Sequence, residues 1–118
     1  MDCETIKMTS IYQDNLQSRC PDLFNLAEYV LENAHKNPTK KALEIISKFS
    51  NYSISFEELK SRVLKTGNAL IKLGLNRNDK ILLRLDNTVT FPIAYLGAIS
   101  VGIIPVPTSI NLTEYELI

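Results

Sequence analysis

Histidine chemistry in this 118-residue chain depends on a single side chain, His35. A zinc site or a Ser-His-Asp catalytic triad would have to be built around it, because the sequence has no second histidine. His35 falls at the carboxyl end of a predicted helix that Pro38 prevents from continuing. Because the helix dipole favours a histidine there, we expect a solvated residue rather than a catalytic one.

Phosphate binding is suggested by two glycines and opposed by the residues that follow them. Gly97 and Gly102 have the spacing of a GxxxxGK[ST] phosphate loop. Ile103 and Ile104 stand where that loop needs a lysine and a hydroxyl for phosphate and magnesium. We therefore expect Gly97 to pack against a neighbouring helix and Gly102 to end its own helix.

Charged and polar pairs offer three further candidates. Glu57-Glu58 lies in the first turn of a predicted helix, where the dipole favours carboxylates. Lys40-Lys41 precedes a strand and is expected to be solvated. Asp86-Asn87 follows a strand at its carboxyl end, where open α/β sheets often bind ligands, but we expect a polar turn that caps the next helix. The sequence therefore assigns no catalytic, cofactor-binding or metal-ligating residue.

The first predicted helix covers about residues 26–36 and precedes two short strands. Asn25 can cap it, with Glu28 three residues later in the capping-box position. Its apolar face is supplied by Leu26, Val30, Leu31 and Ala34. The stretch ALEIIS, residues 42–47, predicts a strand, and KFSNYS turns the chain back into a second strand near residues 52–54.

A second helix is predicted to begin at Ser55, which forms an S-x-x-E capping box with Glu58. Gly74 ends this helix. A glycine within a helix costs about 1 kcal/mol relative to alanine, so Gly67 predicts close approach to a packed neighbour. The apolar face recurs every three or four residues and comprises Phe56, Leu59, Val63, Gly67, Leu70 and Leu73.

The remaining pattern is strand, helix and strand. KILLRL, residues 80–85, is almost continuously apolar, as in a strand covered on both faces. A helix follows from residues 88–90 to about residue 101, with Pro92 in its first turn, and IIPVP predicts another buried strand. This order predicts a βαβ unit with parallel strands, and the fold class is α/β.

Composition excludes several kinds of partner. Thirteen Lys and Arg balance 13 Asp and Glu, so no net charge favours nucleic acid or an anionic membrane. Residues 87–113 carry no charge and exceed the roughly 20 apolar residues that span a bilayer. Glycines, prolines and hydroxyl side chains interrupt them, so we predict a buried helix and strand and no membrane span. A membrane-associated protein remains the alternative for this stretch.

Residues 1–22 show no sustained hydrophobic period and no secretory signal, and they predict a flexible N-terminal arm. Cys3 and Cys20 form neither a disulfide framework nor a CxxC motif. Free thiols in a reducing cytoplasm are the expected state. Residues 23–118 form the second unit.

Two long stretches carry a family resemblance. YSISFEELKSRVLKTGNALIKLGLNRNDKILLRL resembles the N-terminal region of adenylate-forming acyl-CoA synthetases, where a Y-x-x-x-E-L element opens an amphipathic helix that ends in LG. LDNTVTFPIAYLGAISVGIIPVPTSINLTEYEL is similar to the segment that follows, with the family's G-x-x-P-V-P core. Residues 86–99 and FNLAEYVL, residues 24–31, are most similar to the benzoate-CoA ligase branch. The resemblance covers residues 24–118.

This resemblance implies a piece of an acid–thiol ligase. The full-length relative would activate a carboxylic acid, benzoate or another aromatic acid, with ATP and Mg²⁺ and would transfer the acyl group to CoA. The family's phosphate loop, acidic residue, adenine-binding aromatic segment and C-terminal lysine do not occur here. We therefore expect residues 1–118 alone to be an inactive scaffold whose partner is the remainder of the synthetase chain.

The last residues are expected to start a helix that Thr113 caps, but five residues are too few to nucleate it. Parallel strands would also leave apolar edges uncovered. Residues 23–118 are therefore expected to be the incomplete N-terminal part of an AMP-dependent synthetase/ligase domain. The alternatives are a stand-alone, non-catalytic α/β binding or interaction module, a peptide-synthetase adenylation domain and a luciferase-like oxygenase.

Overall fold

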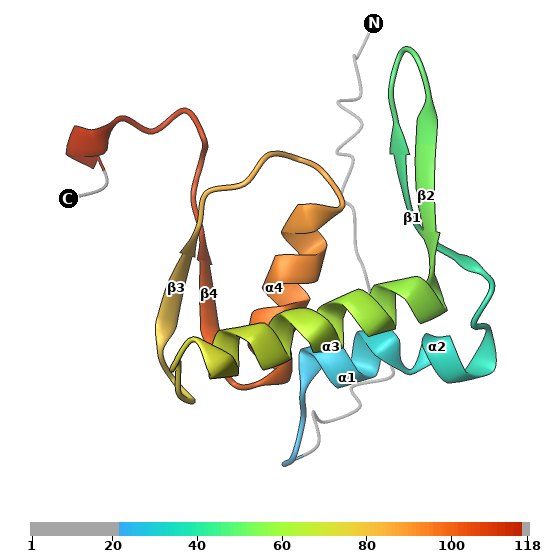
Figure 1. The fold of residues 1–118 in the computed structure, drawn as a ribbon, viewed down its shortest axis with the longest axis horizontal. Helices are drawn as coiled ribbons and strands as arrows, with labels where there is room; N and C mark the ends of the chain where they lie inside the picture. The colour runs from blue at the N-terminus through green and yellow to red at the C-terminus, as the bar shows by residue number, and fades with distance from the viewer. Residues whose placement is uncertain (1–21, 117–118) are drawn as a thin grey trace, which may run out of the picture.

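A capping box begins the longest helix of the computed structural model, which describes residues 22–116. This helix is α3 (Phe56–Lys72) (Figure 1). The Ser55 hydroxyl accepts from the Glu58 amide at 3.2 Å, and the Glu58 carboxylate accepts from the Ser55 amide at 3.0 Å. Gly74 follows the helix in the left-handed region, with φ of +94°. Both ends of α3 are confirmed.

The helix predicted over residues 26–36 is divided in two, α1 (Leu26–Leu31) and α2 (Asn33–Lys36). Glu32 lies between them, and its amide donates to the Tyr29 carbonyl three residues back, at 3.4 Å. This tighter spacing replaces the four-residue bond of an α-helix and ends α1 there. The single continuous helix was therefore wrong.

Asn25 caps α1, since its side-chain oxygen accepts from the amides of Ala27 and Glu28 at 2.9 and 3.2 Å. The buried face of α1 is made by Ala27 and Leu31, four residues apart. Leu26 was expected on that face, but it is 40% exposed because it lies one position outside the buried stripe.

Strands β1 (Lys41–Ile46) and β2 (Asn51–Ser55) form the predicted antiparallel hairpin. Figure 1 shows it standing away from the helices at the start of α3. Leu43 pairs with Ile54 near its base, and Ile54 is among the most deeply buried side chains described. The base of the hairpin therefore joins the core.

Strand β3 (Lys80–Leu83), helix α4 (Thr90–Ser100) and strand β4 (Ile104–Pro107) form the predicted βαβ unit. The strands are parallel, in a register that runs from Lys80 beside Ile104 to Leu83 beside Pro107. Pro92 lies in the first turn of α4, where its missing amide proton costs no helix bond. The α/β class is confirmed.

The two faces of the β3–β4 pair differ. Leu83 is 7% exposed, whereas Leu82 is 56% exposed and its neighbour Val106 is 38% exposed. Alternate residues of a strand point to opposite faces, so only one face is covered by the described residues. The prediction that β3 is buried on both faces is therefore wrong for this part of the chain.

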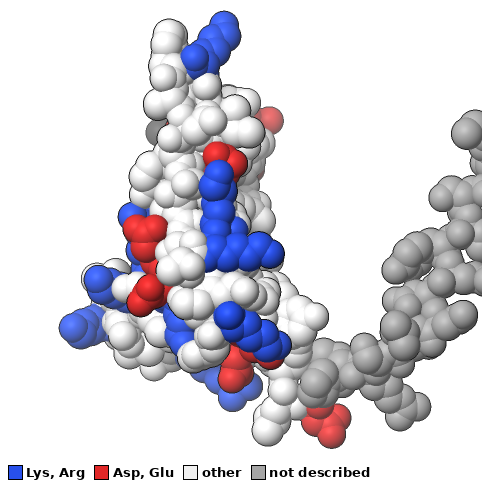
Figure 2. All heavy atoms as spheres, turned by 90° about the vertical axis from the view of Figure 1, so that its right-hand side faces the viewer, with Lys and Arg blue, Asp and Glu red and all other residues white. Residues whose placement is uncertain are grey.

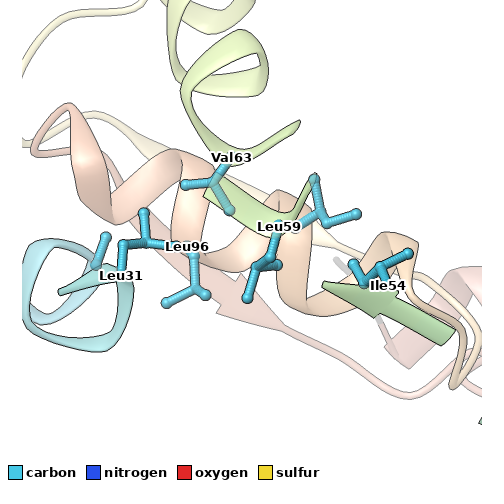
Figure 3. Packing of buried hydrophobic residues seen from close by; sticks show 7 residues of the cluster. Leu31, Ile54, Leu59, Val63 and Leu96 are labelled. Carbon is cyan, nitrogen blue, oxygen red and sulfur yellow. The ribbon is translucent and has the colours of Figure 1, made fainter. Parts of the chain in front are cut away.

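The core lies where α3 crosses α4, and α1 and β2 also contribute buried residues to it. Figure 3 shows Val63 and Leu59 of α3 close to Leu96 of α4 and Leu31 of α1. Gly67 and Gly97 permit the crossing, because a Cβ at Gly67 would lie 2.7 Å from the Ser100 hydroxyl. The close approach predicted for both glycines is confirmed.

The predicted face of α3 is buried near this crossing and open beyond it. Leu59, Val63 and Gly67 are buried, whereas Leu73 is 77% exposed. Leu73 was expected on the buried face, but it is the C-cap and lies past the contact with α4.

Three observations concern the remaining residues. The helix expected after Thr113 is a single 3₁₀ turn, η1 (Glu114–Glu116), as its shortness predicted.

Residues 87–113 fold as helix and strand, and no helix in the described range is long and apolar enough to cross a membrane. The arm predicted for residues 1–22 lies, apart from Asp22, outside the described residues and stays a prediction.

Candidate functional site

The carboxyl ends of β3 and β4 meet at one edge of the sheet, where the sequence placed Asp86-Asn87. The Thr108 amide donates to the Leu83 carbonyl at 2.9 Å, which continues the pairing one residue past β4. Arg84, Asp86 and Asn87 follow β3 and are exposed. This edge, with residues 84–87 and 108–113, is the candidate site because ligands of open α/β sheets bind outside the carboxyl ends of the strands.

Asp86 lies in a tight turn, since its carbonyl accepts from the Thr88 amide at 2.8 Å. The predicted turn is therefore present. Its predicted capping role was wrong, because Val89 is the N-cap of α4 and no side chain bonds to the first amides of that helix. The Asp86 and Asn87 side chains remain available on the surface.

Arg84 was not selected from the sequence, yet it makes the longest-range side-chain bonds at this edge. Its Nη2 donates to the carbonyl oxygens of Ile110 and Leu112 at 2.8 and 2.6 Å. These residues lie in the segment after β4, residues 108–113, which we call the strap. The sequence feature that could have identified Arg84 is a cation directly after the apolar strand KILL.

Thr108 begins the strap with a polar atom that lacks a partner. Its hydroxyl oxygen is buried and forms no hydrogen bond within the described residues. Buried hydroxyls normally have a partner, so this one can bond to a group from outside residues 22–116.

The strap ends at a local hydrogen-bonded turn. The Glu116 carboxylate accepts from the amide and the hydroxyl of Thr113 at 2.8 and 2.9 Å. The bond from the Thr113 amide is the main reason that the pKa of Glu116 lies below its ordinary value of 4.5, and the hydroxyl bond adds to it. The charged form of Glu116 therefore holds the turn.

His35 lies in the last turn of α2 and is exposed, as predicted. Its Nε2 is 2.8 Å from Nζ of Lys60 on α3, within hydrogen-bonding distance. Both residues line a surface cavity of about 410 Å³ between α1, α2 and α3.

A carboxylate that lines this cavity already has a partner in the protein. Glu32 forms an ion pair with Lys36 at 2.6 Å, and this hydrogen bond lowers the pKa of Glu32 and raises that of Lys36. Among residues 22–116, no three His, Cys, Asp or Glu side chains come together as a possible metal site. The described residues around this cavity therefore offer no cluster of metal ligands.

The other sequence candidates have structural roles. Glu58 closes the capping box of α3, and Lys41 forms an exposed ion pair with Glu44 at 2.8 Å. Gly97 packs against Thr66 of α3, and Gly102 has φ of +77° directly after α4. The predicted packing and helix-ending roles of these glycines are confirmed.

Surface charge gives no sign of a polyanion site on the face that Figure 2 presents. Lys and Arg side chains alternate there with Asp and Glu side chains. Nucleic-acid sites need a continuous basic patch, so this face does not match one.

Comparison with known proteins places the fold in a family. The model of the family described as AMP-binding enzyme matches residues 30–118. The chain is 43% identical over 61 residues to the 4-hydroxybenzoate–CoA/benzoate–CoA ligase of Rhodopseudomonas palustris. The aligned region covers 52% of this chain and 11% of that ligase. The benzoate–CoA ligase of Thauera aromatica is 38% identical over 65 residues, covering 54% of this chain and 12% of the ligase.

A solved structure agrees with these relatives. The benzoate CoA ligase from Burkholderia xenovorans LB400 aligns with a TM-score of 0.68 and 33% identity, covering 77% of this chain and 18% of the ligase. This chain therefore spans a small part of the length of its relatives. The match over residues 30–118 includes α3 and the βαβ unit, and the chain belongs to the AMP-binding enzyme family, whose adenylate-forming acyl-CoA ligases it resembles.

Proposed function

We propose that the protein carrying this chain is an AMP-forming acid–thiol ligase. In the first step, a carboxylate oxygen attacks the α-phosphorus of ATP, which gives an acyl-adenylate and releases pyrophosphate. In the second step, the CoA thiol attacks the acyl carbon, which gives the thioester and releases AMP. The observation that carries this proposal is the family match over residues 30–118.

The acid is proposed to be aromatic, with benzoate and hydroxybenzoates as the first candidates. The support is the identity to two benzoate–CoA ligases and the fold match to a third. We also assign the activity to the cytoplasm, because Cys3 and Cys20 have no disulfide framework around them.

Residues 22–116 contribute scaffold to this proposed reaction. The fully buried residues among them are apolar, and no three His, Cys, Asp or Glu side chains of this range come together as a metal site. The whole protein would use ATP and CoA, with Mg²⁺ to neutralise phosphate charge. The described residues do not bring together the carboxylates that would hold that ion.

The remainder of the synthetase chain is the proposed partner of this segment. Leu82, Ile104 and Val106 form the open face of the β3–β4 pair, with exposed fractions of 56, 44 and 38%. An apolar sheet face of this kind is expected to be covered by further chain.

Acid-dependent ATP–pyrophosphate exchange tests the proposal. Residues 1–118 are expected to give no exchange, since adenylation depends on electrostatic groups that this chain lacks. The full-length protein is expected to exchange with benzoate and hydroxybenzoates. Exchange by residues 1–118 would contradict the scaffold role. If the full-length protein exchanged with aliphatic acids alone, the aromatic substrate would be contradicted. If the full-length protein gave no exchange with any acid, the ligase activity itself would be contradicted.

A further inference from the structure

The strands β3 and β4 bond to each other through alternate residues. The Ile104 amide donates to the Asp79 carbonyl at 2.8 Å, and the Thr108 amide donates to the Leu83 carbonyl at 2.9 Å. In a parallel pair, the residues between such bonding positions direct their N–H and C=O groups to the opposite edge of the strand. The register of the pair therefore shows which backbone groups lie on each of its two outer edges.

The outer edge of β4 lacks hydrogen-bond donors. Pro105 and Pro107 occupy the outward positions between Ile104 and Thr108. Their backbone nitrogens carry no hydrogen, so neither residue can donate to a strand on that side. Prolines within sheets are confined largely to edge strands for this reason. The sequence of β4 therefore suits the edge of a sheet.

The outer edge of β3 has both donors and acceptors. Lys80 and Leu82 are its outward residues, because the carbonyls of Asp79 and Leu83 accept from the side of β4. Each outward residue presents an N–H and a C=O group. Among the described residues, β3 and β4 form a two-stranded sheet, and Figure 1 shows no other helix or strand beside β3 on the side away from β4. A row of such groups is a template for a further strand.

The pair also lacks the surroundings that parallel strands normally have. Parallel sheets occur almost only where both faces are covered, yet Leu82 on one face is 56% exposed. The aligned regions cover only 11% and 12% of the two benzoate–CoA ligases. A whole protein of that length would contain further strands that could complete the sheet.

We propose that a strand of the remaining synthetase chain pairs with β3 through Lys80 and Leu82, and that β4 is an edge strand of the completed sheet. The inference rests on the proposed function, which supplies the longer chain. Consecutive strands are neighbours in most sheets, so continuation on β4 is the competing order. The prolines of β4 oppose that order, and β3 then lies between the new strand and β4.

Hydrogen–deuterium exchange in the full-length protein tests this order, with electron-transfer fragmentation to resolve single amides by mass spectrometry. The amides of Lys80 and Leu82 are expected to exchange at least about a hundredfold more slowly than unprotected amides. The amides of Ile81 and Leu83 face β4 and are internal controls that either order protects. Fast exchange at Lys80 and Leu82 beside slow exchange at the controls would overturn the proposal. Protection that disappears on dilution to monomers would assign the edge to a second copy and would also overturn it.

The Pro105→Ala variant tests the other edge, because it adds an amide at an outward position of β4. This amide is expected to exchange rapidly in the full-length protein, since no strand should lie beside it. Slow exchange there would show a neighbour on β4 and contradict its edge position. Neither measurement depends on catalysis: protected Lys80 and Leu82 amides in a protein without pyrophosphate exchange would support the strand order and contradict the ligase. Unprotected amides in an active ligase would do the reverse.

Discussion

The carbonyl oxygen of Gly97 lies 3.1 Å from the position that a Cβ at Gly67 would occupy. The backbones of α3 and α4 therefore approach so closely that neither position leaves room for a side chain. Because α4 lies between β3 and β4 in sequence, this crossing also places the β3–β4 pair relative to the rest of the fold.

Enlarging Gly67 tests the crossing. Gly67→Leu is expected to lower the free energy of unfolding of residues 1–118 by about 1–3 kcal/mol, because the added side chain meets Ser100 and Val101. Lys65→Leu on the exposed face of α3 should change it by less than about 0.5 kcal/mol. Urea denaturation followed by circular dichroism measures both. Equal effects would mean that the assignment of the buried face is wrong.

The capping box gives a second prediction, with a control in the same helical turn. Ser55→Ala should cost about 1 kcal/mol of unfolding free energy, and Glu58→Ala should cost a similar amount because each removes one reciprocal bond. Glu57→Ala, which removes a first-turn carboxylate without a capping bond, should cost less. Thermal denaturation of the three variants ranks them, and a larger loss in Glu57→Ala would contradict the capping assignment.

The two faces of β3 should respond differently to truncation. In residues 1–118, Leu83→Ala is expected to cost about 2–4 kcal/mol, because Leu83 is 7% exposed. Leu82→Ala, at a side chain 56% exposed, should cost less than about 1 kcal/mol. If the remaining synthetase chain covers this face, Leu82→Ala should become as costly as Leu83→Ala in the full-length protein. The same small loss in both contexts would show that this face stays open.

Glu116 provides a pH-dependent prediction. Its folded pKa lies below the ordinary value of 4.5, so its stabilisation of the turn is fully present above pH 4.5 and is lost as the pH falls through the lowered value. Thr113→Val removes the hydroxyl donor and keeps the amide, which should raise the pKa only part of the way to 4.5. Carbon NMR titration of the Glu116 carboxyl measures this, and an identical pKa in both proteins would contradict the hydroxyl contribution.

The sequence correctly predicted the parts of the fold that depend on interactions between residues close together in the chain. Ser55, Gly74 and Gly102 gave the correct helix ends, because capping bonds and left-handed backbone are local. The βαβ unit was also predictable, since an apolar strand on each side of a helix leaves few other arrangements. The break at Glu32 was not, because it depends on a three-residue bond from the Glu32 amide to the Tyr29 carbonyl that no residue type announces.

Exposure and long-range polar contacts could not be predicted from the residues alone. Leu82 and Leu83 are the same residue type in the same strand, and which one is buried depends on which face of the strand the rest of the fold covers. Arg84 reaches two carbonyls far along the chain, and no spacing rule connects an arginine with backbone oxygens. The sequence therefore located the candidate site from the carboxyl end of β3, and the bonds of Arg84 to the two carbonyls were found only in the structure.

The buried cluster joins Ala27, Leu31, Ile54, Leu59, Val63, Ile93 and Leu96, all of which precede residue 100. On a ribosome, these residues are translated before β4, so this core can condense early in synthesis. The apolar face at Leu82 would then await later strands while exposed to water. During synthesis, this open face is therefore the part of the β3–β4 pair with the greatest tendency to aggregate.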